Sequence, residues 1–192
     1  MRRLISAFKV SLDMKFQGPG DYADWVPAWS EDYDLGESID ACLLGGSMYR
    51  GYEAYWSAMR ADPIGPSPMT GTVPTAGELE WSGRIPTLPH YVLTRTMAEA
   101  KWPNTYFLGH TDQVAELKSQ PGKDIYLMGG GALLKHLMEF GLVDELRLLV
   151  YPTTAGGTHD LFAADALRRQ LKLLDTQSLG SGLLRLSYAI SH

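Results

Sequence analysis

Two segments of the chain share one pattern, in which a short apolar strand runs into consecutive glycines and a helix begins at once. The clearer copy is IYLMGGGALLKHLMEFG at residues 125–141, and the second is LLGGSMYRGYEAYW at residues 43–56. Glycine lets the backbone approach a ligand closely, and the free N–H groups and dipole of a helix start favour an anion. The pattern is typical of α/β proteins, whose ligands bind at the carboxyl ends of parallel strands.

Each of these turns also has a plainer interpretation. Residues 129–131 do not complete the GxGxxG fingerprint, because Leu134 occupies the third glycine position, and small residues also suit a tight strand–helix turn. Three consecutive glycines cost backbone entropy, so we favour an anion site there. In the second copy, Ser47 can be an ordinary cap of a helix over residues 47–59, and the two interpretations stay even.

A third strand is predicted to end in LTRT, residues 93–96. Arg95 lies between Thr94 and Thr96, and a guanidinium group can bind two phosphoryl oxygens at once. On this segment alone a solvated loop arginine is the simpler alternative.

The chain length and the regular alternation of predicted strands and helices predict one α/β domain over residues 1–192. We expect a three-layer α/β/α fold with a mostly parallel central sheet and an antiparallel C-terminal edge, formed by residues 170–177 and 183–190. The other predicted strands cover residues 3–12, 41–44, 90–94, 105–108, 124–128 and 145–150, and the predicted helices cover 31–39, 47–59, 78–81, 112–119 and 132–140.

An acidic and aromatic segment follows the first strand. Glu31, Asp32 and Asp34 lie close to Trp25 and Trp29. A carboxyl group against aromatic walls can relay protons to a substrate, and we take Asp32 as the candidate catalytic acid. The alternative is an acidic first turn of the 31–39 helix. The residues that can line a planar substrate are Trp25, Trp29, Tyr49, Tyr52 and Trp56, with core packing as the alternative for at least half of them.

Composition excludes several other classes. The formal net charge of −5 argues against a nucleic-acid partner. The single cysteine, Cys42, cannot form a disulfide within the chain, and we expect it to be a small buried apolar residue. The five histidines lack metal-ligand spacing, so we predict no metal. No apolar run approaches ~20 residues, and no signal peptide is recognisable, so we expect a cytoplasmic protein without a membrane segment.

Taken together, these segments resemble the RibD C-terminal family, the reductase domain of the bacterial bifunctional deaminase-reductase of riboflavin biosynthesis, within the dihydrofolate reductase-like superfamily. The resemblance covers essentially the whole chain. It rests on FKVSLD (8–13), LLGGSMYRGYEAYW (43–56), LTRT (93–96), residues 121–162 with their GLVDEL stretch, and SGLLRLSY (181–188).

The resemblance implies a dihydrofolate reductase-like fold, a homodimer, and NADPH as cofactor. It also implies hydride transfer to a small heterocyclic substrate, as in dihydrofolate reductase or 5-amino-6-(5-phosphoribosylamino)uracil reductase. Three groups of residues would hold the cofactor: Gly129, Gly130, Gly131, Ala132 and Leu133 along the pyrophosphate; Gly45, Ser47 and Met48 in a second phosphate turn; and Thr94, Arg95 and Thr96 at the adenosine end.

The chain departs from the family's pattern at three positions. Gly46 stands where the family often has an arginine that contacts the 2′-phosphate, Met48 replaces a threonine, and Met14 replaces the glycine of SLDG. Arg95 is then the main candidate for choosing NADP over NAD. Two alternatives stay open, namely a dinucleotide-binding module without catalysis and a scaffold with an empty site.

Overall fold

Strands and helices alternate along most of the chain. The computed structural model describes residues 1–18, 22–26, 33–68, 71–157, 159–162 and 168–191. The strands are β1 (Leu4–Ser11), β2 (Ile39–Gly45), β3 (His90–Leu93), β4 (Thr105–Leu108), β5 (Asp124–Met128), β6 (Glu145–Tyr151), β7 (Leu171–Ser178) and β8 (Leu184–Ile190). The helices are α1 (Gly46–Ala61), α2 (Ala76–Arg84), α3 (Asp112–Ser119) and α4 (Gly131–Glu139), with 3-10 turns η1 (Gly36–Ser38) and η2 (Ile85–Thr87).

Within the described residues, the strands form one eight-stranded sheet in the order β4-β3-β2-β5-β1-β6-β8-β7. The strands from β4 to β6 pair in parallel, whereas β8 pairs antiparallel with both β6 and β7. The predicted mostly parallel sheet with an antiparallel C-terminal edge is therefore confirmed. Because β1, β2, β3, β5 and β6 run the same way, their carboxyl ends share one edge of the sheet.

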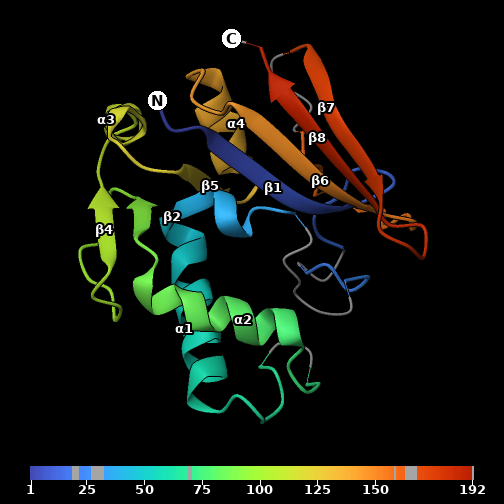
Figure 1. Ribbon diagram of the computed structural model, residues 1–192, viewed down its shortest axis with the longest axis horizontal. Coiled ribbons are helices and arrows are strands. Elements are labelled where there is room, and N and C mark those ends of the chain that lie inside the picture. The colour runs from blue at the N-terminus through green and yellow to red at the C-terminus, as the bar shows by residue number, and fades with distance from the viewer. Residues whose placement is uncertain (19–21, 27–32, 69–70, 158, 163–167, 192) are drawn as a thin grey trace.

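Helices cover both faces of the parallel part of the sheet (Figure 1). On one face, Trp56 of α1 and Trp81 of α2 are buried in a core that includes Tyr126 of β5. On the other, Val114 of α3 and Leu134 of α4 are buried in a second core. Each fully buried side chain of this size contributes about 1.5–3 kcal/mol to folding. The three-layer prediction is thus confirmed.

The predicted helix over residues 31–39 is wrong over its described part. Residues 33–35 are not helical, η1 covers only Gly36–Ser38, and Ile39 already begins β2. Asp34 has a left-handed backbone with φ of 59°, which a right-handed helix does not contain. Residues 31–32 lie outside the described part of the chain.

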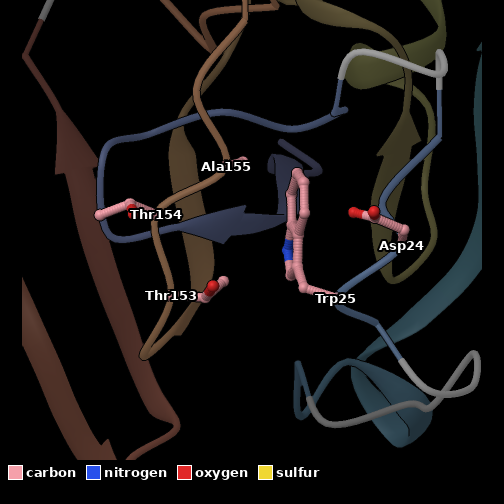
Figure 2. Close-up of a pocket in the computed structure, with 5 residues that line it drawn as sticks. All are labelled: Asp24, Trp25, Thr153, Thr154 and Ala155. Atoms are coloured by element: carbon pink, nitrogen blue, oxygen red, sulfur yellow. The ribbon is translucent and has the colours of Figure 1, made fainter.

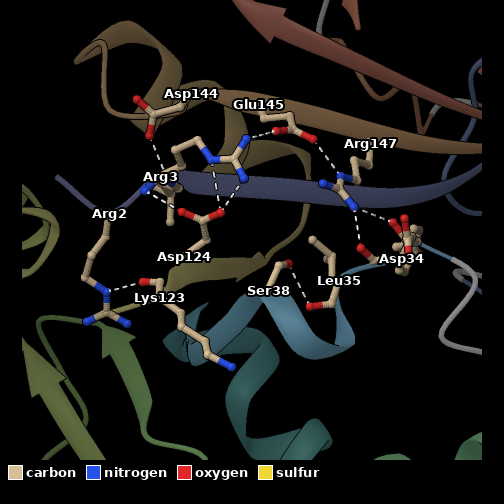
Figure 3. Close-up of polar contacts among 12 residues, drawn as sticks. Arg2, Arg3, Asp34, Leu35, Ser38, Lys123, Asp124, Asp144, Glu145 and Arg147 are labelled. Atoms are coloured by element: carbon tan, nitrogen blue, oxygen red, sulfur yellow. Dashed lines mark hydrogen bonds and ion pairs between the residues drawn. The ribbon is translucent and has the colours of Figure 1, made fainter. Parts of the chain in front are cut away.

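Charged side chains tie this segment to the amino-terminal part of the sheet (Figure 3). Arg3 links three strands, since its guanidinium lies 2.5 Å from Asp124 of β5 and 2.9 Å from Glu145 of β6. Arg147 of β6 pairs with Glu145 and donates hydrogen bonds to the main-chain carbonyls of Tyr33 and Asp34, at 2.8 and 2.6 Å. The chain that leads into β2 is therefore held against β6.

Candidate functional site

The three sequence motifs come together at the carboxyl edge of the sheet. β2 lies between β3 and β5, and in the register Gly45 is opposite Leu93 while Leu44 is opposite Met128. The three strands consequently end level with one another. The turns that follow them, beginning at Gly46, Thr94 and Gly129, are neighbours, as expected for one shared binding crevice.

The turn between β5 and α4 leaves main-chain donors at the helix start. Gly130 is the N-cap residue and supplies no side-chain cap. The N–H groups of Leu133 and Leu134 donate to the Gly130 carbonyl at 3.1 and 3.2 Å. Among the described residues, the amides of Gly131 and Ala132 are thus left as the helix-start donors that can bind an anion. The Leu133 amide, which was also expected to lie along the pyrophosphate, already donates within the helix.

Neighbouring side chains cover only part of this turn. A Cβ atom at Gly129 would lie 2.9 Å from Leu133 Cδ2, and one at Gly131 would lie 3.3 Å from the ring of Phe16. A Cβ at Gly130 would meet no atom within 4 Å, and Gly130 and Ala132 are exposed. One side of the turn is packed, and the side that carries Gly130 is open to a ligand.

The turn between β2 and α1 is built differently from our expectation. Its N-cap is Gly45, with no side-chain cap hydrogen bond, so Ser47 is not the cap and lies exposed in the first helical turn beside Met48. A Cβ atom at Gly46 would lie 2.7 Å from Thr94 Oγ1 and 2.9 Å from Thr94 Cβ. The close packing of the turn after β3 against the start of α1 leaves no room for a side chain at position 46.

The loop that carries Arg95 is anchored at both ends. Thr94 Oγ1 accepts hydrogen bonds from the amides of Thr96 and Met97, at 3.3 and 3.2 Å. Further along, the buried carboxylate of Glu53 on α1 accepts from the Lys101 and Trp102 amides, at 2.6 and 3.1 Å. Arg95 itself is exposed. Its guanidinium makes no hydrogen bond or ion pair with the described residues, so it is available to a ligand.

A pocket of about 270 Å³ lies near the same edge, beside the ends of β1 and β6 (Figure 2). Its lining residues are Asp24, Trp25, Thr153, Thr154 and Ala155. The indole nitrogen of Trp25 is buried, and no described residue accepts its hydrogen. In Figure 2 the indole faces the loop of Thr153–Ala155, and Asp24 lies beside it.

Asp13 fixes one wall of this pocket. Its carboxylate accepts hydrogen bonds from the amides of Ala155 and Gly156, each at 3.0 Å, and from the Ser11 hydroxyl at 2.5 Å. The Ser11 hydroxyl and the two amides hold the pKa of the Asp13 carboxyl well below its usual range. The Leu12 amide also donates to the Thr153 carbonyl at 2.7 Å. The loops after β1 and β6 are therefore held together.

The structure places the candidate acidic and aromatic residues in different surroundings. Asp32, Glu31 and Trp29 lie outside the described residues. Asp34 is exposed, and its carboxylate lies 3.5 Å from Arg185 of β8. The side chains of Tyr49, Tyr52 and Trp56 are buried in the core, so core packing, the stated alternative, applies to these three.

Other predictions concern absences and Cys42. Cys42 is free and buried, as predicted. Among the described residues, no group of three or more histidine, cysteine, aspartate or glutamate side chains is placed to hold a metal ion. No helix in the described part of the chain has the length and apolar character needed to cross a membrane.

The edge of the sheet has donors that suit phosphate groups. Free helix-start amides at Gly131 and Ala132 suit a pyrophosphate, an open Gly130 permits close approach, and exposed Arg95 suits a further phosphate. These features define a class, namely an α/β domain with neighbouring anion-binding turns at the carboxyl ends of parallel strands.

Comparisons with known proteins identify the family within this class. The sequence model of the RibD C-terminal domain family matches residues 2–185, and the chain belongs to that family. Over 196 residues it is 31% identical to the uncharacterized protein YyaP of Bacillus subtilis, covering 97% of this chain and 94% of YyaP.

Solved structures support the fold. A putative riboflavin biosynthesis protein from Shewanella is 17% identical, with a TM-score of 0.69 and 99% of both chains covered. Dihydrofolate reductase from Enterococcus faecalis, solved with NADP(H), is 12% identical, with a TM-score of 0.60, covering 99% of this chain and 97% of that chain. The predicted dihydrofolate reductase-like fold is therefore confirmed.

The pocket beside β1 and β6 was missed from the sequence. Trp25 was singled out only as one of five possible aromatic walls, and Asp24 and Thr153–Ala155 were not selected at all. Their sequence separation of about 130 residues leaves no local pattern, because the pocket depends on β1 pairing with β6. The sequence signal was the segment at residues 17–29, which is predicted to be a loop and has too many aromatic residues for a plain linker.

Proposed function

We propose that this protein is an NADPH-dependent reductase that transfers a hydride to a small heterocyclic substrate. The observation that carries the proposal is the meeting of three strand-end turns at one edge, with free helix-start amides and an open glycine at Gly130. Membership in the RibD C-terminal domain family supports a reductase-type role, and the dihydrofolate reductase neighbour was solved with NADP(H).

Three parts of the chain would bind the cofactor. The amides of Gly131 and Ala132, with Gly129 and Gly130, would hold the pyrophosphate, while the backbone of Leu133 supports that turn. Gly45, Ser47 and Met48 would form the second phosphate turn. Thr94, Arg95 and Thr96 would hold the adenosine end, with Arg95 as the cation for a 2′-phosphate. When bound, the cofactor supplies the hydride, and the protein contributes position and electrostatics.

Asp32 stays the candidate proton donor to the substrate. Its neighbour Asp34 is a weaker candidate, because it lies near Arg185. A dihydrofolate-like or pyrimidine-like ring is the proposed substrate class, and replacement of Asp32 by asparagine is expected to remove turnover while leaving NADPH affinity unchanged.

A titration with NADPH and with NADH tests the proposal. We expect NADPH to quench tryptophan fluorescence and to raise the unfolding free energy by ~2.7 kcal/mol at about 100 times its Kd. NADH is expected to bind more weakly, because Arg95 has no 2′-phosphate to contact. The proposal is wrong if neither dinucleotide changes fluorescence or melting temperature.

The homodimer expected from the resemblance stays a prediction. The edge strand β7 is exposed over most of its length, and Leu173 and Leu174 are each 50% exposed. Such an edge is a ready template for another chain. Light scattering of the wild type and of Leu174→Lys tests whether this edge holds two copies together, since the lysine is expected to yield monomers.

A further inference from the structure

Three polar residues on one face of α1 bind the same loop. Tyr49, Glu53 and Ser57 are spaced four residues apart, so they lie one above another along the helix. Their partners lie at the end of residues 94–104 (the Arg95 loop) and at the start of β4. The contacts are those of the Tyr49 hydroxyl with Thr105 Oγ1 at 2.7 Å, of the Glu53 carboxylate with the Lys101 and Trp102 amides, and of the Ser57 hydroxyl with Trp102 Nε1 at 3.0 Å. This face of α1 therefore holds the end of the Arg95 loop.

The Glu53 carboxylate is the centre of these contacts. Glu53 is 7% exposed, and its Oε1 atom accepts from the Tyr49 hydroxyl at 2.9 Å as well as from the two loop amides. A buried carboxylate needs such donors to replace its lost hydration, and hydrogen bonds to a charged acceptor are the strong ones. Burial raises the pKa of Tyr49, so its hydroxyl stays a donor. One side chain thus joins the helix to the main chain of the loop.

The two ends of the Arg95 loop are fixed close to Arg95 itself. At the first end, the amides of residues 96 and 97 donate to the Thr94 hydroxyl. At the second, the amides of residues 101 and 102 donate to Glu53, and only three residues separate the two anchored pairs. Arg95 is exposed on this short, anchored loop. An arginine presented by a preformed loop loses less conformational entropy when it binds a ligand.

The same helix also begins at one of the proposed phosphate turns. α1 starts at Gly46, and Glu53 lies seven residues further on, about 10 Å along the axis at 1.5 Å per residue. The first end of the Arg95 loop packs on this helix start, where a Cβ atom at Gly46 would lie 2.9 Å from Thr94 Cβ. Helix α1 therefore contacts the loop at both ends and sets the position of Arg95 relative to the phosphate turn.

We infer that Glu53 is a positioning residue for cofactor choice: by holding the Arg95 loop on α1, it gives the proposed reductase its preference for NADPH over NADH. The inference rests on the proposed function and adds a residue that contacts no atom of the cofactor. Arg95 supplies the charge for the 2′-phosphate, and Glu53 acts on it only through the loop amides. If Glu53 served the fold alone, its loss would weaken both dinucleotides alike.

Calorimetric titration of the full chain with NADPH and with NADH tests the inference. Glu53→Met fills a similar volume without an acceptor for the loop amides. We expect its affinity for NADPH to fall about ten-fold and its affinity for NADH to change about two-fold or less, because NADH has no phosphate for Arg95. Glu53→Gln keeps a side-chain oxygen that the amides can bind, so it is expected to retain most of the preference for NADPH.

A double variant and a control separate positioning from stability. Arg95→Ala is expected to remove the preference for NADPH, and adding Glu53→Met to it should lower the ratio of the two affinities no further, because both act through one guanidinium. Val143→Ala opens a cavity in the second core, on the other face of the sheet. It should lower the melting temperature and leave the ratio unchanged.

The outcomes distinguish this inference from the proposed function. A wild-type ratio in Glu53→Met, or an equal loss of affinity for both dinucleotides, would overturn the inference and leave the reductase function standing. The same holds if the wild type binds NADH as tightly as NADPH. If the wild type binds neither dinucleotide, both proposals are wrong.

A milder variant decides the question if Glu53→Met does not fold. Tyr49→Phe keeps the buried ring but removes one hydrogen bond from the Glu53 carboxylate and the contact with Thr105. We expect it to narrow the ratio of NADPH to NADH affinity by about three-fold. An unchanged ratio in folded Tyr49→Phe would then count against the inference.

Discussion

The two halves of the candidate site are built from different materials. The proposed cofactor edge at the ends of β2, β3 and β5 consists mainly of backbone groups, namely glycines and helix-start amides, with one exposed arginine. The pocket beside β1 and β6 consists of side chains on two loops, joined through the Asp13 carboxylate. A backbone site requires close approach and is damaged by added atoms, whereas a side-chain site is damaged by removed atoms or charge.

The largest expected effect is on the pH dependence of stability, and it comes from a buried histidine at the start of β3. His90 at the start of β3 is fully buried, with the rings of Tyr52 and Trp102 at 5.7 and 5.2 Å, and burial lowers its pKa to about 4. Above pH ~6.5 the group is neutral in both folded and unfolded states and has no effect. Below pH ~6.5 His90 takes up a proton in the unfolded chain before it does so in the folded one. The free energy of unfolding therefore falls by about 2 kcal/mol at pH 5 and about 3 kcal/mol near pH 4.

His90→Phe keeps an aromatic ring and removes this titration. We expect urea unfolding of the variant to show a smaller loss of free energy between pH 7.5 and pH 4.5 than the wild type shows. Asp13 remains ionised through this window, because its pKa lies well below the ordinary range, so the pocket wall should not contribute to the difference. Identical losses in both proteins would mean that His90 is not the group responsible.

An added methyl group at Gly46 tests the backbone character of the cofactor edge. In Gly46→Ala the new Cβ would lie 2.7 Å from Thr94 Oγ1, so we expect a destabilisation of about 1–3 kcal/mol and weaker NADPH binding through the displaced Arg95 loop. Gly51→Ala on the same helix meets nothing within 4 Å and should stabilise by roughly 0.5–1 kcal/mol. Thermal unfolding of both variants decides the matter, and equal effects would show that the contact with Thr94 is unimportant.

Gly130→Ser also tests whether backbone groups form the proposed cofactor edge, and it is expected to change the stability of the fold less than Gly46→Ala does. A Cβ there meets no atom within 4 Å, and serine at an N-cap differs from glycine by only a few tenths of a kcal/mol. Its hydroxyl would however accept a hydrogen bond from the Ala132 amide, one of the two helix-start amides proposed for the pyrophosphate. We expect the Kd for NADPH to rise about ten-fold, or ~1.4 kcal/mol, with unfolding unchanged. Unaltered NADPH affinity would place the pyrophosphate elsewhere.

The contrast between the two halves also explains what the sequence could predict. The strand–glycine–helix pattern at residues 43–56 and 125–141 is local, so it predicted the parallel sheet and the turns at its carboxyl edge, whose anion binding stays a prediction. The details failed where tertiary contacts decide. Gly45 rather than Ser47 caps α1, and Gly46 packs on Thr94, the residue that follows β3. The helix predicted over residues 31–39 is wrong over its described part. The acidic residues were interpreted as the first turn of a helix, but the left-handed backbone at Asp34 does not fit a right-handed helix.

Asp13→Asn gives the smallest and most local effect, and it tests the side-chain half. Asp13 uses one carboxylate oxygen for the Ala155 amide and the other for the Gly156 amide. Asparagine keeps one acceptor oxygen and places an NH₂ group where the second was, so one of the two bonds must be lost. Because Asp13 is only half-buried, we expect little change in global unfolding but amide hydrogen exchange faster on the order of ten-fold at Ala155 or Gly156. Exchange at the Gly131 and Ala132 amides should stay the same, since those groups belong to the backbone half. If exchange rose at both sets of amides, the two halves would be one cooperative unit, and the division between a backbone site and a side-chain site would be wrong.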